Sequence, residues 1–213
     1  MTGLPVGALV AILAGFGAPA AAHPHHWVEI TGEVRFDAAG RVTALHQTWR
    51  YDELSSAVKL AGLDWDLDGA PDPDKLATMA ELLLDDLSGE AWYVTLLDDD
   101  GATRLGPPAE VSAEAPELRL TLSFSLPLAP ARDPRQAPIA YMVYDPSFQT
   151  QFLHAAPDAV RLAGGPPDCG VEIEPARPSA RLIAQAAAID LGAASPPDLG
   201  AGFADRVRVR CGE

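Results

Sequence analysis

The sequence predicts an α+β fold: a single domain of mainly antiparallel strands, with an EF-hand-like helix-loop-helix insertion and one C-terminal disulfide. Three observations predict it. Many short segments alternate apolar with polar residues between Pro and Gly turns, as half-buried strands do. Residues 53–88 contain two helical patterns around an Asp-rich loop. The chain has two cysteines, Cys169 and Cys211, and both lie near its C-terminus.

Residues 1–22 are predicted to be a signal peptide. An uncharged apolar run from Val6 to Phe16 precedes the small residues 18–22, as an h-region precedes its cleavage site. The run is too short to cross a bilayer core of about 30 Å. We therefore expect export to the periplasm, with cleavage after Ala22 or after Ala20. The alternative is a buried N-terminal helix.

A hairpin and two helices are predicted to follow. Residues 27–36 and 42–51 alternate in polarity on either side of a turn at 37–40, which indicates two paired strands. Residues 53–63 are the first predicted helix. The second begins with Asp72 as N-cap and Pro73 as its first residue, and it ends at Ser88-Gly89. Its buried face consists of residues at helical spacing: Leu76, Met79, Ala80, Leu83, Leu84 and Leu87.

The rest of the chain is predicted to be mostly strands. The clearest covers 118–126, where Leu118, Leu120, Leu122, Phe124 and Leu126 share one face. A helix is expected over 179–191. The main domain then spans 23–191, and residues 192–213 hold a Pro/Ala/Gly linker and a last strand over 207–211. The other predicted strands cover residues 92–97, 139–144, 149–154 and 171–174.

Charge and cysteine content narrow the classes of function. The formal net charge of −15 disfavours binding to nucleic acid or to anionic membranes and favours binding of cations. Two cysteines in an exported chain predict a disulfide between Cys169 and Cys211. The alternative is a metal site with two thiolates, but neither cysteine has a second ligand at metal-site spacing. The 213 residues, less 22, leave 191, enough for one domain with a core.

Three of the five histidines, His23, His25 and His26, lie directly behind the predicted cleavage site. A chain beginning at His23 could chelate a metal ion through its terminal amine and imidazole, with His25 or His26 adding a nitrogen. Such ligands suit Ni, Co, Zn and Cu. A chain beginning at Ala21 would instead offer the square-planar set that Cu(II) and Ni(II) prefer. The alternative is a flexible polar tail.

The two other histidines, His46 and His154, lie on predicted strands. His46 lies on the second strand and is a candidate further ligand if the hairpin brings it to the start of the first strand. His154 ends a later strand. A single histidine of this kind is more often a surface residue or one whose hydrogen bonds are satisfied.

The Asp-rich loop is a candidate calcium site. Asp64, Asp66 and Asp68 occupy positions one, three and five of an EF-hand loop, Gly69 occupies position six, and Ala70 and Asp72 supply positions seven and nine. Position twelve should be a bidentate Glu and is Lys75 instead. The sequence is therefore consistent with a weak calcium site or with a loop that has kept its turn and lost its ion.

Taken together, several motifs resemble the periplasmic DUF1007 proteins, an uncharacterised component of transport systems. The resemblance covers His23 to about Glu174. It rests on His23-Pro24-His25, the segment from Gln47 to Leu54, the Asp64–Gly69 loop, Leu126-Pro127-Leu128, the segment from Tyr144 to Phe148, and the Cys169 region. It implies a role in transition-metal homeostasis beside nickel/cobalt-type membrane permeases. Lys75 and the Ala/Pro-rich tail after Pro175 depart from the family pattern.

We therefore expect a soluble periplasmic accessory protein that binds Ni, Co, Zn or Cu through the N-terminal histidines and serves a membrane metal permease. One alternative is an interaction subunit that docks on the permease without binding metal. The other is a copper-dependent enzyme. An enzyme is not favoured, because the chain has no Gly-x-Ser-x-Gly motif, no phosphate-binding glycine loop and no His-Glu-x-x-His motif.

Overall fold

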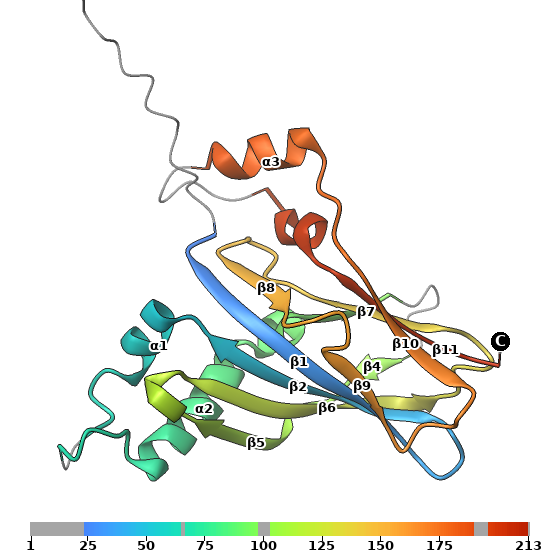
Figure 1. Ribbon diagram of the computed structural model, residues 1–213, viewed down its shortest axis with the longest axis horizontal. Coiled ribbons are helices and arrows are strands. Elements are labelled where there is room, and N and C mark those ends of the chain that lie inside the picture. Colours follow the sequence, from blue (N-terminus) through green and yellow to red (C-terminus); the bar gives the residue numbers. More distant parts are fainter. Residues whose placement is uncertain (1–23, 65–66, 98–102, 190–195, 213) are drawn as a thin grey trace, which may run out of the picture.

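The computed structural model describes residues 24–64, 67–97, 103–189 and 196–212, and in these ranges strands predominate (Figure 1). The predicted signal peptide, His23 and Asp66 lie outside the described residues. The strands are β1 His26–Phe36, β2 Val42–Tyr51, β3 Val94–Leu96, β4 Arg104–Leu105, β5 Ala109–Glu114, β6 Thr121–Arg132, β7 Ile139–Val143, β8 Thr150–His154, β9 Val160–Ala163, β10 Cys169–Glu174 and β11 Arg206–Cys211. The α-helices are α1 Glu53–Leu60, α2 Pro73–Asp86 and α3 Ala180–Ala187, and the 3-10 helices are η1 Ser88–Tyr93, η2 Pro116–Leu118 and η3 Leu199–Phe203.

The strands form two sheets. The larger has seven strands in the order β4-β6-β2-β1-β8, with β5 also paired to β6 and β9 also paired to β1. The smaller has the order β10-β11-β7-β3. All pairs are antiparallel except β1 with β8 and β1 with β9. The predicted α+β fold with mainly antiparallel strands is confirmed. The alternation of residues did not reveal the two parallel pairs.

The core lies between the sheets and contains residues of both. Trp49 is completely buried, and its ring centroid lies 4.9 Å from that of Phe124 and 4.8 Å from that of Phe152. Burial alternates along β1 and β2, so one face of the larger sheet packs into the core and the other carries polar side chains. Other core residues come from β1 (Val28, Ile30, Val34), β6 (Leu122, Phe124, Leu126), β7 (Ile139, Tyr141, Val143) and β11 (Val207, Val209).

The outer edge of β1 is divided between two strands. β8 pairs with the first part of β1, from His26 to Ile30, and β9 pairs with the later part, from Gly32 to Arg35. Residues 155–159 connect β8 to β9 and remain attached to β1, because the amide of Gly32 donates to the carbonyl of Ala159 at 2.9 Å. This connection therefore forms a wall beside the middle of β1.

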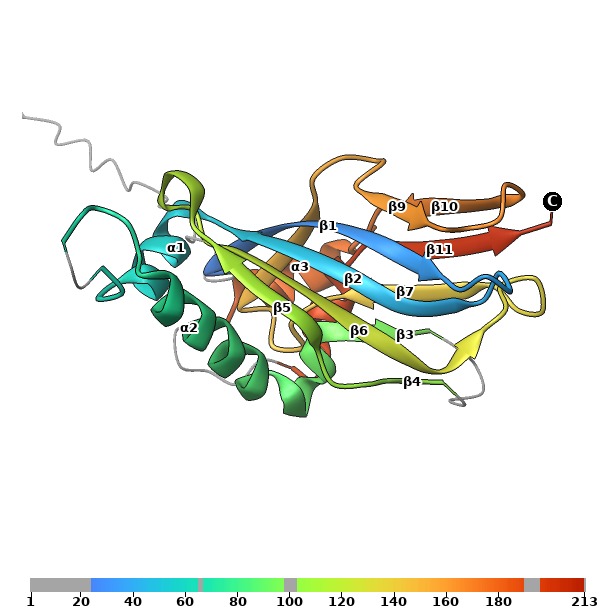
Figure 2. The ribbon, with the colours of Figure 1, turned by 90° about the horizontal axis from the view of Figure 1, so that it is seen from below.

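The helix-loop-helix insertion is present as predicted, although its first helix ends at Leu60 and not at Leu63. α1 begins at the N-cap Asp52, whose side chain accepts a hydrogen bond from the amide of Ser55. α2 lies alongside β5 (Figure 2) and buries Leu76, Ala80 and Leu84. α2 begins as predicted, with Asp72 in the N-cap position and Pro73 as its first residue, although the Asp72 side chain makes no capping hydrogen bond there.

Two predicted strands differ from the observed ones. Leu118 lies in η2 with a positive φ of 58° and is 56% exposed, so it does not share the buried face of β6. β6 also continues past Leu126, because the Pro127 carbonyl still accepts a hydrogen bond, from the amide of Gly106 at 2.7 Å. The strand predicted over 92–97 shortens to Val94–Leu96, since Trp92 and Tyr93 have left-handed φ values.

A smaller apolar cluster joins the C-terminal elements to the strand region. Phe148 packs against Ala186, Ile189 and Leu199, and its ring lies 4.0 Å from that of Phe203. Leu199 and Gly200 are buried, so the far end of the segment predicted as a linker is packed. Among the described helices, none combines the length and the apolar character that crossing a membrane requires.

Candidate functional site

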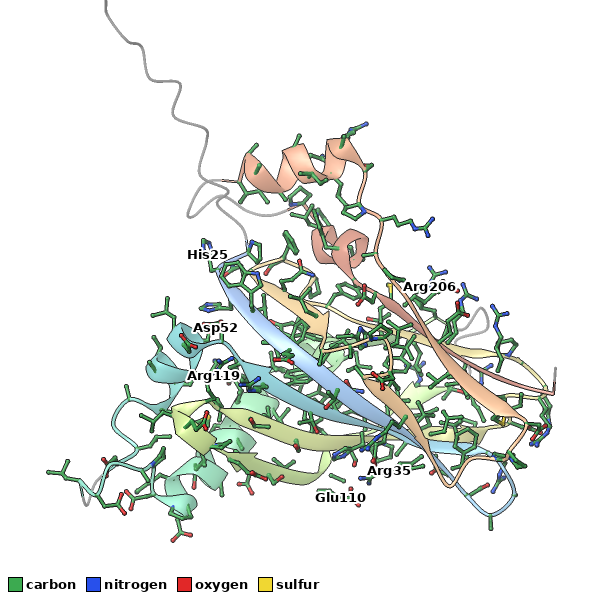
Figure 3. All side chains as sticks on the ribbon, viewed as in Figure 1. His25, Arg35, Asp52, Glu110, Arg119 and Arg206 are labelled. Atoms are coloured by element: carbon green, nitrogen blue, oxygen red, sulfur yellow. A yellow bond between two sulfur atoms is a disulfide. The ribbon has the colours of Figure 1, made fainter. Side chains whose placement is uncertain are left out.

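His25 and His26 lie at the start of β1, beside α1. Their amides both donate to the carbonyl of Gln149, at 2.8 and 3.1 Å, and His26 pairs with Thr150 of β8. Figure 3 shows His25 near Asp52, at the opposite end of the sheet from Arg35 and Glu110. The described part of the histidine cluster is therefore anchored to β8 at the end of the sheet where β1 begins, and it is not a free tail.

Asp52 and Ser55 hold the His26 imidazole. Nδ1 of His26 lies 2.8 Å from the hydroxyl of Ser55, and this hydroxyl donates to the Asp52 carboxylate at 2.5 Å. The same carboxylate accepts from the amides of Trp27 and Ser55, both at 2.9 Å. Burial alone would raise the pKa of Asp52, but these donors together outweigh it and lower the pKa.

The hydrogen bonds determine the tautomer of His26. Ser55 has one hydroxyl proton, and it goes to Asp52, which as a carboxylate has no proton to return. The hydroxyl can then only accept from His26, so Nδ1 carries the ring proton and Nε2 carries the lone pair. His26 is exposed, so Nε2 belongs to a surface imidazole. Metal-binding histidines are typically oriented through the other ring nitrogen in this way.

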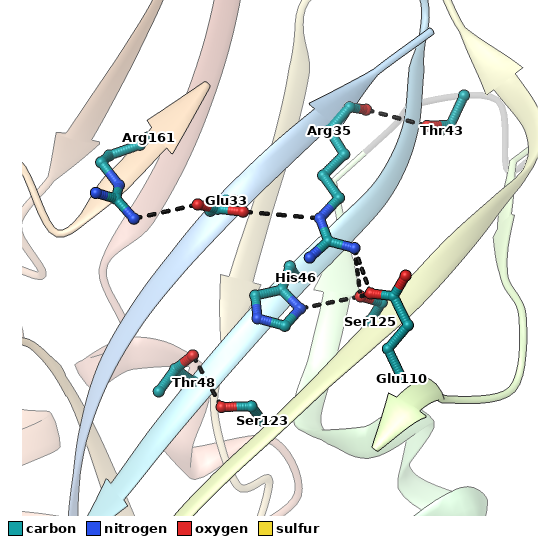
Figure 4. Close-up of polar contacts among 9 residues, drawn as sticks. All are labelled: Glu33, Arg35, Thr43, His46, Thr48, Glu110, Ser123, Ser125 and Arg161. Carbon is teal, nitrogen blue, oxygen red and sulfur yellow. Dashed lines mark hydrogen bonds and ion pairs between the residues drawn. The ribbon is translucent and has the colours of Figure 1, made fainter. Parts of the chain in front are cut away.

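His46 has an equivalent arrangement in the middle of the sheet (Figure 4). Its Nδ1 lies 2.9 Å from the hydroxyl of Ser125, which is 3% exposed and donates to the Glu110 carboxylate at 2.8 Å. Arg35 contacts both Glu110 and Ser125. The one hydroxyl proton of Ser125 goes to Glu110, so the hydroxyl can only accept from His46. The ring proton of His46 is therefore on Nδ1 and the lone pair on Nε2.

The surroundings of His46 shift two pKa values. Burial and the nearby Arg35 lower the pKa of His46, although Glu33 and Glu110 act in the other direction. Hydrogen bonds from Arg35 and Ser125 lower the pKa of Glu110. His46 is therefore held in its neutral form near pH 7.

The structure does not bring His46 to the N-terminal histidines. In the β1–β2 hairpin the start of β1 lies opposite the end of β2, so Val28 pairs with Tyr51 while His46 pairs with Glu33. At about 3.3 Å per residue, the seven positions from His26 to Glu33 correspond to roughly 23 Å. His46 is thus too far along the sheet to share a metal ion with His26, and its suggested role as a fourth ligand is wrong.

His154 is a buried, partnered histidine. Its side chain is 6% exposed, and its Nδ1 lies 2.9 Å from the Asp205 carboxylate, which also accepts from the amide of Ala176. The hydrogen bond from His154 is the main cause that lowers the pKa of Asp205. This contact connects the end of β8 to the segment before β11.

In the Asp-rich loop, carboxylates of the described residues bind the backbone of the loop itself. Asp64 accepts from the amides of Asp68 and Gly69, at 3.1 and 3.0 Å, and Asp68 accepts from the amide of Ala70 at 2.9 Å. Gly69 has a φ of +94°, which favours glycine at the turn. Asp72 is tied to the segment that follows α1 by its amide, which donates to the Leu63 carbonyl. These contacts are those of a self-stabilised turn.

Within residues 24–64, 67–97, 103–189 and 196–212, no group of three or more His, Cys, Asp or Glu side chains is arranged to hold a metal ion. Cys169 and Cys211 form the predicted disulfide, as a directly paired couple on β10 and β11 with Cα atoms 4.0 Å apart. The cysteines are therefore not thiolate ligands.

Comparison of the chain with protein families tests the resemblance to DUF1007 proteins that the motifs suggest. Residues 8–211 match the model of the family described as "Protein of unknown function (DUF1007)". The chain belongs to this family. A comparison with curated proteins finds no match. The DUF1007 match reaches beyond Glu174, so the C-terminal region with the second cysteine also lies within the matched range.

Sequence reasoning missed the partners of the histidines in this DUF1007 protein. Asp52 and Ser55 were identifiable in part, since Asp at a helix start with a polar residue three positions later is a common N-cap pattern. Glu110 and Ser125 gave no such signal. They lie far from His46 in the sequence, and only the register of β2, β5 and β6 brings them together.

Proposed function

We propose that this protein is a periplasmic accessory protein that binds a transition-metal ion, Ni, Co, Zn or Cu, at His23, His25 and His26 and serves a membrane metal permease. The observation that carries the proposal is the chain of hydrogen bonds from Asp52 through Ser55 to His26. It keeps the proton on Nδ1 and leaves Nε2, the ligand atom, on the surface.

The donor set fits these ions. Neutral imidazole nitrogen is a common ligand of Zn, Cu and Ni, and His25 follows directly on the segment where His23 would supply an amine and a further imidazole. The net charge of −15 adds a general attraction for cations. Because an imidazole must be neutral to bind a metal ion, the affinity should fall on acidification.

The test uses the mature protein purified after export. Intact mass spectrometry identifies the first residue and counts bound ions, and calorimetry with Ni²⁺, Co²⁺, Zn²⁺ and Cu²⁺ gives the affinity. His26→Ala should weaken binding of the preferred ion at least about tenfold, because removing even a residue that only orients a metal-binding histidine costs that much. Glu29→Gln is the matched control, since Glu29 lies on the same strand and pairs with Arg50. Equal affinities of the His26 variant and the wild type would refute the proposal.

An acidic surface that docks on a permease without metal is the second candidate, and the net charge favours it. The same experiment separates the two functions. A mature protein that binds none of the four ions, while it still associates with a permease in detergent, would assign the docking role.

A further inference from the structure

A row of polar side chains crosses the outer face of the larger sheet from β9 to β5. The row contains Arg161, Glu33, His46, Ser125 and Glu110, each from a different strand (Figure 4). Neighbours along the row are joined by ion pairs, hydrogen bonds or direct strand pairing. In this row the His46 imidazole lies between Ser125, which contacts its Nδ1, and Glu33, its partner in the strand register.

The position of Glu110 depends on an irregular backbone. The pairing of β5 with β6 is interrupted between Ala109 and Ser112, and Glu110 has a left-handed φ of 53°. An interruption of this type re-aims a side chain, and a non-glycine residue in this conformation is strained. Here the result is that the Glu110 carboxylate meets Ser125 and Arg35. Strain at this position therefore serves the orientation of His46.

A cavity of about 480 Å³ lies beside His46. Its floor consists of outward side chains of β1 and β2, including Thr31, Glu33, His46 and Thr48. Its wall is formed by Ala155, Ala156, Asp158 and Ala159. Nε2 of His46 points away from Ser125, toward the β1 side of the sheet (Figure 4). The volume is in the range of small-molecule sites.

The lining residues include two carboxylates and one guanidinium group, and His46 adds a further hydrogen-bond acceptor. Nε2 of His46 is an acceptor, and Glu33 and Asp158 are carboxylates. Arg161 is the lining cation, and it already donates to Glu33 at 3.1 Å. An anionic ligand would meet the Asp158 carboxylate, a Glu33 carboxylate that is paired with Arg161 and Arg35, and a protein of net charge −15. A ligand that donates protons and carries positive charge fits better.

We propose that this cavity binds a small organic cation with a protonated amine, whose N–H group donates to Nε2 of His46 and whose charge lies near Glu33 and Asp158. The proposal is independent of the metal site, because it uses none of the N-terminal histidines. Hydrogen bonds from a charged primary ammonium group to oxygen or nitrogen acceptors are stronger than hydrogen bonds between two neutral groups.

Acid should abolish this binding. The charged groups facing His46 are Glu33 and Arg35 of β1, Glu110 of β5, Arg161 of β9, and Asp158 of the wall. The pKa of His46 lies below its ordinary value of 6.5, because burial and Arg35 disfavour the cation. Below pH 6.5 the ring progressively gains a proton, loses its acceptor and repels an ammonium ion. Affinity should therefore be constant from about pH 7 up to the pH at which the amine itself loses its proton, and it should fall as the pH decreases through the pKa of His46.

The experiment is a calorimetric titration of the full mature protein with methylammonium, ethanolamine and putrescine. Tetramethylammonium, which has the charge but no N–H group, and acetate serve as comparison probes. Saturable binding of at least one primary amine is expected, with tetramethylammonium at least about tenfold weaker because it cannot donate a hydrogen bond. Acetate that binds as well as the amines, or no saturable binding of any amine at millimolar concentration, would overturn the proposal.

Variants locate the binding. Glu33→Gln and His46→Ala should each weaken the best amine about tenfold or more, whereas Glu29→Gln, on the same strand but outside the cavity, should not. Circular dichroism and thermal unfolding check that each variant is folded. Should His46→Ala fail to fold, nitrogen NMR of the wild type remains decisive. The shift of Nε2 must report a lone pair and must move when the amine is added, and a proton found on Nε2 would contradict the inference.

Discussion

At the start of β1, Asp52 and Ser55 orient His26, and in the middle of the same sheet Glu110 and Ser125 orient His46. In both regions a serine hydroxyl donates to a carboxylate and accepts from Nδ1 of the imidazole. The two regions therefore present the same chemical group, an imidazole that is held through its Nδ1 and has Nε2 as its ligand atom.

The regions differ in what lies around that lone pair. His26 is exposed and follows directly on His25 at the edge of the sheet. His46 is half-buried beside a cavity that Glu33, Asp158 and Arg161 line. A lone pair among other imidazoles suits a transition-metal ion, and one among carboxylates suits an ammonium group. The hydrogen bond of Nδ1 orients each histidine so that Nε2 can bind a ligand. The neighbouring side chains determine which kind of ligand binds.

The largest effect is expected when the histidines of each region are removed separately and the binding of both ligands is measured. Replacement of His23, His25 and His26 by Ala should remove saturable metal binding. This loss of more than about 100-fold exceeds the effect of removing a residue that only orients a metal-binding histidine. The same variant should bind amines as the wild type does. His46→Ala should show the reverse. Calorimetry with the preferred metal ion and with the best amine measures both, and loss of both ligands in either variant would show that the regions are not independent.

Asp52→Asn should reduce metal affinity by about 10- to 100-fold, the range found for partners of metal-binding histidines. Asn keeps the N-cap of α1, since it caps helices about as well as Asp. The folded state should therefore be preserved while the negative charge behind Ser55 and His26 is lost. Metal titration together with the melting temperature separates these effects. If affinity falls only in proportion to lost stability, Asp52 has a structural role alone.

The contrast also shows what the sequence could predict. Alternating residues predicted β1, β2 and much of β6, and helical spacing predicted α2, because each pattern is local. β5 and β9 were missed, since they are short and only partly buried. The N-terminal histidines are neighbours in the chain, so the sequence alone identifies them as candidate ligands. The His46 cavity was not, because Glu33, Glu110, Ser125 and Arg161 meet only through strand register.

Ser125→Ala should lower the free energy of unfolding by about 1 kcal/mol, the typical value for a lost hydrogen bond. Ser125 is nearly buried, and its hydroxyl contacts Arg35, His46 and Glu110. Ser112→Ala is the control, because Ser112 lies exposed on β5 and such changes usually stay within about 0.5 kcal/mol. Urea unfolding followed by tryptophan fluorescence measures both. Equal stability of the two variants would mean that the Ser125 contacts add nothing to the fold.

The smallest predicted effect distinguishes Glu110 from Asp52, because different interactions lower the pKa of each carboxylate. The pKa of Glu110 is lowered first by the hydrogen bond from the charged Arg35, and the Glu110 side chain is 60% exposed. For Asp52, burial raises the pKa and neutral donors, the Ser55 hydroxyl and the amides of Ser55 and Trp27, lower it further than burial raises it.

Salt should act on these two groups differently, because the screening length falls from about 30 Å at 0.01 M to about 3 Å at 1 M ionic strength. High salt should move the pKa of Glu110 up toward its ordinary value of 4.5 and leave that of Asp52 nearly unchanged. Carbon NMR of the side-chain carboxylates, titrated with acid at the two ionic strengths, measures both. A carboxylate whose pKa is lowered in the folded state stabilises the fold at pH values above its ordinary pKa. This contribution is lost as the pH falls through the lowered pKa. High salt should therefore reduce the part of the acid sensitivity that comes from Glu110, and an equal shift of Asp52 would show that a charge also stabilises the carboxylate behind His26.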